Sequence, residues 1–243
     1  MPFPRRRRAL LLGPAVACGL SLHPAPRAAA QAPPAPEEVL PMAPDAAPAG
    51  TARPLRPDER AAMTGVVWTP DCPVPLDALV VLELPHHDGA GGTPTGRLVV
   101  HRDVADDLLG VFARLFAIGF PIPSMQPAET FGGDDDASMA ANNTVAFHCR
   151  KVAGTQVWSE HASGRALDLN PLWNPWVRPD PAAPDGLRVA PEAGRAWALT
   201  RSDAPGLILP DGPVVQAFAA IGWGWGGTWR RARDLQHFSA SGR

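Results

Sequence analysis

The sequence predicts an α+β protein, with one domain in which helices pack on a mainly antiparallel sheet. A few segments carry apolar residues at helical spacing, and others alternate apolar and polar residues as short strands do. The two kinds of segment do not alternate regularly along the chain. A regular alternation would be expected of a parallel α/β sheet, so the irregular order favours the α+β class.

Residues 1–30 are typical of a secretory signal. Arg5–Arg8 form a positive start, residues 9–22 are apolar but too short to span a bilayer, and Ala28–Ala30 offers small residues for cleavage. The paired arginines leave the twin-arginine export route open, and Cys18 leaves a lipoprotein anchor open. We therefore expect a periplasmic or secreted protein with no membrane span in its mature form.

Residues 31–60 are rich in Pro and Ala and are predicted to be a linker, because they bury too little apolar surface to order themselves. Residues 61–243 remain for one domain. Five of the 22 basic residues lie in the predicted signal, which leaves 17 against 24 acidic residues and a net charge of −7. This balance argues against a nucleic-acid partner. The sequence does not indicate an oligomeric state.

Cys72 and Cys149 are the two cysteines left after removal of the signal. An even pair in an exported protein favours one disulfide, with two free thiols as the alternative. A bridge would tie the start of the domain to the region before its main motif.

Residues 97–101 predict a strand that leads into a helix. Asp103 is expected to cap this helix, and Gly119 followed by Pro121 is expected to end it. Its apolar positions are spaced for one buried face, so we expect them in the core: Val104, Leu108, Leu109, Val111, Phe112, Leu115 and Phe116.

The segments after this helix are less regular. Residues 131–136 are acidic but lack the spaced ligands of a calcium loop, so a solvated turn is expected. Residues 145–149 predict a strand. Residues 170–210, rich in Pro and Trp, are typical of a lid or pocket wall and include a possible short helix at 192–199. A helix opening at 211–213 and ending at Gly222 follows, and residues 222–229 predict a strand or hairpin.

His161 and Asp168 flank a predicted chain reversal at Ser163–Gly164. On one helix the pair would be about 10 Å apart along the axis, and on one straight strand more than about 20 Å apart. Neither geometry lets them share a small ion. Glycine permits a tight turn, and residues 165–169 then alternate like a strand that carries Asp168 on one face. The segment is therefore interpreted as one that directs two side chains to one point.

Asp234 and His237 are three residues apart, which places them on one side of a helical or turn-like segment. If this segment lies against the loop of His161 and Asp168, two histidines and two aspartates meet. Zinc suits such a set, because two imidazoles and one carboxylate leave a position for water, and a second acid can take the proton of that water. Each pair alone occurs often by chance.

Two motifs carry a family resemblance. The first is Ser159-x-His161-x-x-Gly164-x-Ala166-x-Asp168, and the second is Asp234-x-x-His237-Phe238. Together they resemble the zinc-binding motifs of the D-alanyl-D-alanine carboxypeptidase and L-alanyl-D-glutamate endopeptidase family. The resemblance spans roughly residues 64–243, with residues 142–150 and 222–229 similar to an extended bacterial subgroup, and it implies the Hedgehog/DD-peptidase fold.

The resemblance implies that His161, Asp168 and His237 bind Zn²⁺ and that Asp234 is the general base. The carboxypeptidase branch usually has glutamate at the position of Asp234. The aspartate found here is closer to the pattern of the endopeptidase branch. Arg150 falls where the family places an arginine that polarises the scissile carbonyl or holds a substrate carboxylate. A structural ion pair is the alternative for Arg150.

The implied function is an exported zinc metallopeptidase that hydrolyses an amide bond in the peptide stem of bacterial peptidoglycan, of the D,D-carboxypeptidase or L,D-endopeptidase type. Stem peptides would be its partners. One alternative is a non-catalytic zinc-containing module of the same fold that binds the cell wall or a partner. Another is a structural zinc site, which generally has four protein ligands. The sequence does not specify which bond is cut.

Other residues near the motifs have open roles. Ser159 is expected to hydrogen-bond near the ligands or to stabilise the turn. His148 is expected to be a packed or surface histidine. Trp223, Trp225 and Trp229 are expected mostly in the core, although one of them could line a substrate groove.

Overall fold

The structure is a computed structural model that describes residues 49–201 and 204–243. The predicted signal sequence and residues 31–48 of the predicted linker lie outside the described residues. The α-helices are α1 Pro57–Met63, α2 Ala105–Ala117, α3 Asp135–Ala140, α4 Arg195–Leu199 and α5 Pro213–Ala219. The strands are β1 Thr51–Pro54, β2 Leu79–Pro85, β3 Thr95–His101, β4 Ser124–Met125, β5 Asn143–Thr144, β6 Ala166–Asp168, β7 Trp176–Pro179, β8 Leu187–Ala190, β9 Gly224–Trp225, β10 Arg233–Asp234 and β11 His237–Ser239.

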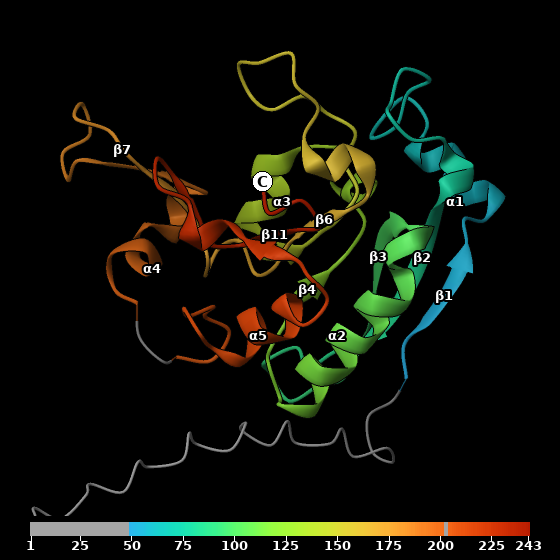
Figure 1. Ribbon diagram of the computed structural model, residues 1–243, viewed down its shortest axis with the longest axis horizontal. Coiled ribbons are helices and arrows are strands. Elements are labelled where there is room, and N and C mark those ends of the chain that lie inside the picture. The colour runs from blue at the N-terminus through green and yellow to red at the C-terminus, as the bar shows by residue number, and fades with distance from the viewer. Residues whose placement is uncertain (1–48, 202–203) are drawn as a thin grey trace, which may run out of the picture. The chain divides into compact units, whose positions relative to one another are not determined.

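Within the described residues the strands form three antiparallel sheets, ordered β1-β2-β3, β10-β7-β8 and β6-β11-β9, and one short parallel pair, β4-β5. Figure 1 shows these small sheets with the helices arranged around them. The mixed, mainly antiparallel arrangement confirms the predicted α+β class. No helix among the described residues is long and apolar enough to cross a membrane.

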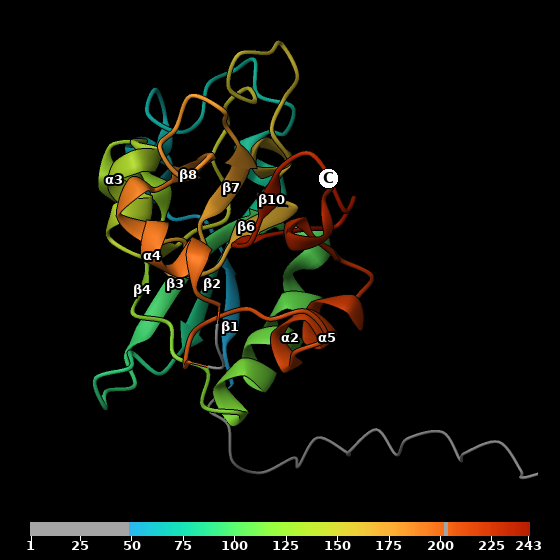
Figure 2. The same ribbon diagram turned by 90° about the vertical axis from the view of Figure 1, so that its left-hand side faces the viewer.

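The first sheet and α2 form the largest regular unit. Helix α2 packs on β2, and α5 packs beside α2, as Figures 1 and 2 both show. The predicted apolar face is confirmed: Val104, Leu108, Val111, Phe112 and Leu115 are buried, while Leu109 and Phe116 are partly buried. Gly119 follows the helix with a left-handed φ of 69°, as its role as terminator requires.

The predicted cap of α2 is wrong. A 3₁₀ turn, Arg102–Val104, separates β3 from α2, and the side chain of His101 accepts a hydrogen bond from the backbone nitrogen of Asp103. The Asp103 carboxylate instead binds the Arg165 guanidinium at 2.9 Å. The inserted turn moves Asp103 away from the position that a capping residue occupies.

The folded part of the chain begins earlier than the predicted boundary at residue 61. Strand β1, inside the predicted linker, pairs with β2 from Thr51 to Pro54. Arg53 fixes it there, since its guanidinium binds Glu83 at 2.8 Å and Glu59 of α1 at 2.7 Å. A short edge strand that ends in proline has the composition of a linker, which explains the error.

The acidic run 131–136 is not a plain solvated turn. Asp134 caps α3 by accepting a hydrogen bond from the nitrogen of Ala137, and Asp135 turns inward to bind His148. Residues 145–149 do not form the predicted strand. They are an irregular segment whose backbone bonds different partners in turn, Asp168, Val99 and Val67 among them, so no single ladder develops.

The predicted loop 170–210 contains the β7–β8 hairpin, which the sequence did not predict, as well as α4, which it did. Residues 222–229 form the short strand β9 followed by a 3₁₀ turn, Gly226–Thr228. Trp223 and Trp225 are buried as expected, and Phe218 of α5 stacks on Phe238 of β11 with ring centres 4.0 Å apart. This packing anchors the strand that carries His237.

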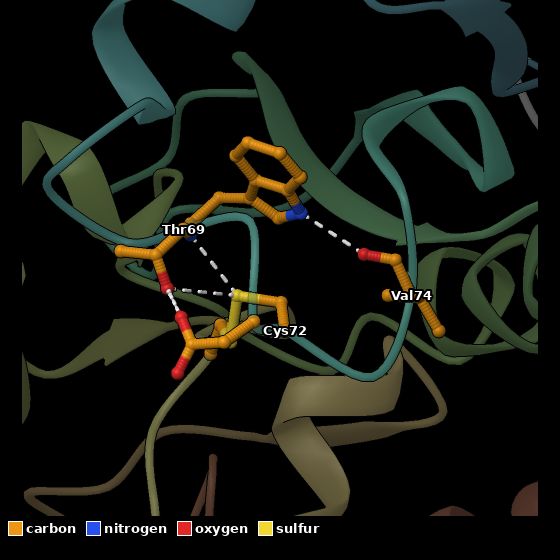
Figure 3. The surroundings of a disulfide bond; sticks show 6 residues. Thr69, Cys72 and Val74 are labelled. Carbon is orange, nitrogen blue, oxygen red and sulfur yellow. Dashed lines mark hydrogen bonds between the residues drawn. A yellow bond between two sulfur atoms is a disulfide. The ribbon is translucent and has the colours of Figure 1, made fainter.

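Cys72 and Cys149 form a disulfide, shown in Figure 3, so the favoured alternative for these cysteines is confirmed. The Cys72 sulfur also accepts a hydrogen bond from the nitrogen of Thr69. Nearby, the indole nitrogen of Trp68 donates to the carbonyl of Val74 at 2.9 Å. The bridge therefore joins a well-bonded loop to the residue that precedes Arg150.

Candidate metal centre

His161 lies in a 3₁₀ turn, Glu160–Ser163, that the local sequence specifies at both ends. The Ser159 hydroxyl accepts a hydrogen bond from the nitrogen of His161, so this hydroxyl stabilises the turn. Gly164 ends the turn with a φ of 67°, and its carbonyl accepts a hydrogen bond from the nitrogen of His101 at 2.8 Å. The predicted reversal is thus confirmed, and it is held against β3.

Asp168 and His237 meet because their strands pair. In the antiparallel register of β6 and β11, His237 lies directly opposite Asp168. Directly opposed residues project on the same face with Cβ atoms about 4.5–5.5 Å apart. Asp234 and His237 are joined by a turn between two strands, so the turn-like alternative for this motif is confirmed over the helical one.

The side chains of His161, Asp168 and His237 converge on one point. The separations are 3.2 Å between His161 Nε2 and His237 Nδ1, 3.1 Å between His237 Nδ1 and Asp168 Oδ1, and 3.3 Å between His161 Nε2 and Asp168 Oδ1. Ligand atoms about 2.0–2.1 Å from a tetrahedral zinc ion lie about 3.3–3.4 Å apart. The triangle therefore has the size of one face of a zinc tetrahedron, and the donor set fits the metal.

The outer nitrogens of both imidazoles are held by backbone carbonyls. His161 Nδ1 lies 2.6 Å from the carbonyl oxygen of Ala146, and His237 Nε2 lies 3.2 Å from that of Arg243. A ring nitrogen that donates its proton to a carbonyl leaves the other nitrogen with a lone pair for a metal. Both inward-facing nitrogens are thus placed as ligands.

The electrostatics of the buried triangle favour a positive charge at its centre. Burial opposes ionisation of Asp168, but the neighbouring His161 and His237 lower the pKa of its carboxyl group. Burial likewise disfavours charge on His237, yet its hydrogen bond to Asp168 and the charge of that carboxylate raise its pKa to about 9. A buried carboxylate that stabilises positive charge on its neighbours is suited to a divalent cation.

Asp234 lies beside this triangle with a proton-accepting atom available. Its Oδ1 is buried and has no hydrogen-bond partner within the described residues. Burial, reinforced by the negative charge of Asp168, raises the pKa of Asp234 to about 6. Gly226 lets its own segment lie close against the Asp234–His237 segment. A Cβ at this position would lie 2.7 Å from the Asp234 carbonyl oxygen and 3.3 Å from the Cβ of His237.

Arg150 forms an ion pair with Asp135 through its Nε, and the other oxygen of Asp135 binds His148 Nδ1 at 2.8 Å. His148 is therefore a packed histidine, one of the two expected possibilities. Within residues 49–201 and 204–243, Asp135 is the one acidic partner of the Arg150 guanidinium. Burial raises the pKa of Asp135, but His148 and Arg150 outweigh it and leave that pKa below its ordinary value.

The sequence did not indicate roles for Asp135 and Gly226, but Trp229 was among the three tryptophans of which one was expected to line a groove. Asp135 was hidden in an acidic run, although its position after the capping residue Asp134 is a signal for a helix start rather than a loop. The sequence around Gly226 has no pattern that predicts its close contact with the Asp234–His237 segment. Trp229 is only partly buried, and its ring packs on His237 with centres 5.4 Å apart, so among the three tryptophans it is the one that borders the site.

Comparison with known protein families agrees with this geometry. The model of a family described as D-alanyl-D-alanine carboxypeptidase matches residues 153–240, a segment that contains the triangle and Asp234 but begins after Arg150. The comparison with curated proteins found no match, and neither did the comparison with solved structures. The match supports the resemblance carried by the two motifs: residues 153–240 are similar to a peptidase family described as D-alanyl-D-alanine carboxypeptidase.

Proposed function

We propose that the protein is an exported zinc metallopeptidase that hydrolyses an amide bond in the peptide stem of bacterial peptidoglycan. The observation that carries the proposal is the triangle of His161 Nε2, Asp168 Oδ1 and His237 Nδ1, which has the edge lengths of a zinc site with three protein ligands. Three ligands leave a coordination position for water or substrate, as a catalytic rather than a structural site requires. The peptidase family match supports the same reading.

Zinc bound by these three residues would supply a Lewis acid that polarises a water molecule and the scissile carbonyl. Asp234 would take the proton of the attacking water and return it to the departing amine. Two features support this role. Asp234 Oδ1 has no hydrogen-bond partner among the described residues, and the pKa of Asp234 is raised to about 6, since the best pKa for a general base lies near the operating pH.

Arg150 would bind the substrate. Its contact with Asp135 is made through Nε, and the terminal nitrogens of the guanidinium would donate to a carbonyl or a carboxylate. Trp229 packs on His237 and would limit how that ligand ring can rotate. These residues would orient the peptide, while Asp234 moves the proton.

Export is part of the proposal. It rests on the signal-like residues 1–30, and the disulfide between Cys72 and Cys149 supports it because such bridges persist in oxidising compartments. The periplasm or the cell exterior is also where peptidoglycan lies.

The decisive experiment is incubation of the zinc-loaded protein with defined stem peptides, followed by mass spectrometry of the products. The wild type is expected to cut one amide bond, whose position the masses reveal. Asp234→Asn should lower the rate by at least about a hundredfold while zinc content stays near one ion per chain. His161→Ala should lose both zinc and activity.

The matched control is Asp107→Asn, which removes an exposed carboxylate on α2 and should retain full activity. Near-normal turnover by Asp234→Asn would refute its assignment as the base. Stoichiometric zinc binding with no cleavage of any stem peptide would instead support a non-catalytic wall-binding module.

A further inference from the structure

The β10-β7-β8 sheet presents a defined row of side chains next to Asp234. Trp176 of β7 lies opposite both Asp234 of β10 and Ala190 of β8. Arg178, two residues further along β7, lies opposite Arg188 of β8. Since alternate residues of a strand share a face, Asp234, Trp176 and the two arginines project from the same side of the sheet. Figure 2 shows the three strands side by side.

Arg178 and Arg188 are both exposed, and neither forms an ion pair or hydrogen bond within the described residues. The acids of the hairpin are used elsewhere, because Asp185 pairs with Arg195 and Asp180 accepts a hydrogen bond from the nitrogen of Ala182. Like charges directly opposite each other on paired strands are destabilising. A bound anion would relieve this repulsion.

The position of the arginine pair also fits a ligand that reaches the metal centre. The Arg178 guanidinium lies 5.6 Å from the centre of the Trp176 ring, within the range of a cation–π contact that orients it along the strand. Two strand residues span about 7 Å, which an extended peptide also covers in about two residues. An acidic group bound here would therefore lie about two residues from the bond next to Asp234.

We propose that Arg178 and Arg188 form a subsite that binds a carboxylate of the peptide substrate, with Trp176 as the floor between this subsite and Asp234. The subsite deepens the proposed function and rests on it. Guanidinium groups suit this ligand because each donates two parallel hydrogen bonds to a carboxylate. The arginine pair would thus select stem peptides with a free acidic side group over those in which this group is an amide.

The test compares two stem peptides that differ only in whether this group is a carboxylate or an amide. With the zinc-loaded wild type, the carboxylate peptide should have the lower KM. R178Q/R188Q should raise KM for the carboxylate peptide by roughly fivefold to tenfold, change kcat by less than twofold, and leave KM for the amide peptide unchanged. The difference should shrink as salt is added, because exposed charges are screened.

R102Q is the matched control, because Arg102 is also exposed and lies outside this sheet. It should leave both KM values unchanged. Equal KM values of the wild type and R178Q/R188Q for the carboxylate peptide would overturn the subsite. An equal increase of KM for both peptides would also overturn it, because the arginines would then not distinguish the carboxylate from the amide.

A failure of the proposed catalytic function can be distinguished from a failure of the subsite. If the wild type cuts no peptide, equilibrium titration of the same two peptides tests the subsite alone. Tighter binding of the carboxylate peptide that is lost in R178Q/R188Q would then support the subsite without catalysis. Equal binding of both peptides by the wild type would overturn it.

Discussion

Asp135 connects two side chains at the border of the candidate metal centre. One oxygen binds His148, whose backbone nitrogen contacts the carbonyl of His161, and the other binds Arg150. Asp135→Asn should remove the charge that fixes both partners. We expect roughly a tenfold loss of kcat/KM with zinc content unchanged, because partners that orient ligands and substrate groups have effects of this size. Peptide hydrolysis and metal analysis measure the two quantities.

The neighbouring Asp136 provides the control, since it is exposed in the same helical turn. Asp136→Asn should match the wild type. If Asp135→Asn retains full activity, Arg150 does not depend on its ion pair for position.

Glu59 gives the fold a pH-dependent contribution. The hydrogen bond from Arg53, which outweighs burial, lowers the pKa of Glu59 to about 2. A depressed carboxyl pKa stabilises the fold above the unfolded value of about 4.5, and this contribution is lost as the pH falls towards 2. At pH 7, Glu59→Gln should therefore lower the free energy of unfolding by about 1–2 kcal/mol, with allowance for partial screening.

Urea unfolding at pH 7, 4 and 2.5 measures this effect. The gap between Glu59→Gln and the wild type should narrow at each step. Asp77→Asn is the control, because the Asp77 side chain is 82% exposed in its ion pair with Arg60 and should contribute little at any pH. A gap that stays constant down to pH 2.5 would contradict the assignment to Glu59.

At the scale of elements, the turn between His161 and β6 depends on Gly164. Its φ of 67° disfavours other residues, and a Cβ there would lie 2.7 Å from the backbone nitrogen of His101. Gly164→Ala should lower the free energy of unfolding by at least about 2 kcal/mol and weaken zinc uptake. Denaturant unfolding and zinc titration provide the measurements.

The same substitution at Gly110 should have the opposite sign. Gly110 lies within α2 on its exposed side, and nothing is within 4 Å of an added Cβ. Gly110→Ala should stabilise the protein by up to about 1 kcal/mol, since alanine favours the helix. Equal effects at both glycines would show that the Gly164 turn imposes no special constraint.

Elements with a strong local signal were predictable from the sequence. The apolar spacing of α2 and the glycine reversal before Asp168 both depend on neighbouring residues, and both were confirmed. Strand β1 and the β7–β8 hairpin were missed because Pro-rich composition conceals them. Residues 145–149 had a strand-like pattern, but their hydrogen-bond partners lie on several elements, so tertiary contacts decide their form.

For the whole molecule, the convergence of the candidate ligands could be anticipated only from the two motifs together. His161 and Asp168 are 69 or more residues from His237 along the chain, and the pairing of β6 with β11 brings them to one place. No local pattern encodes that register. The inward turn of Asp135 and the close approach at Gly226 likewise arise from packing between distant segments.

The strand order determines where local unfolding of the protein is expected to begin. Strand β11, which carries His237, is the middle strand of its sheet, whereas β1 is an outer strand of another. Amide protons on β1 are therefore expected to exchange with solvent before those on β11. Fraying that starts at β1 would spare the three candidate ligands, so the protein can loosen at its periphery while the candidate metal site stays assembled.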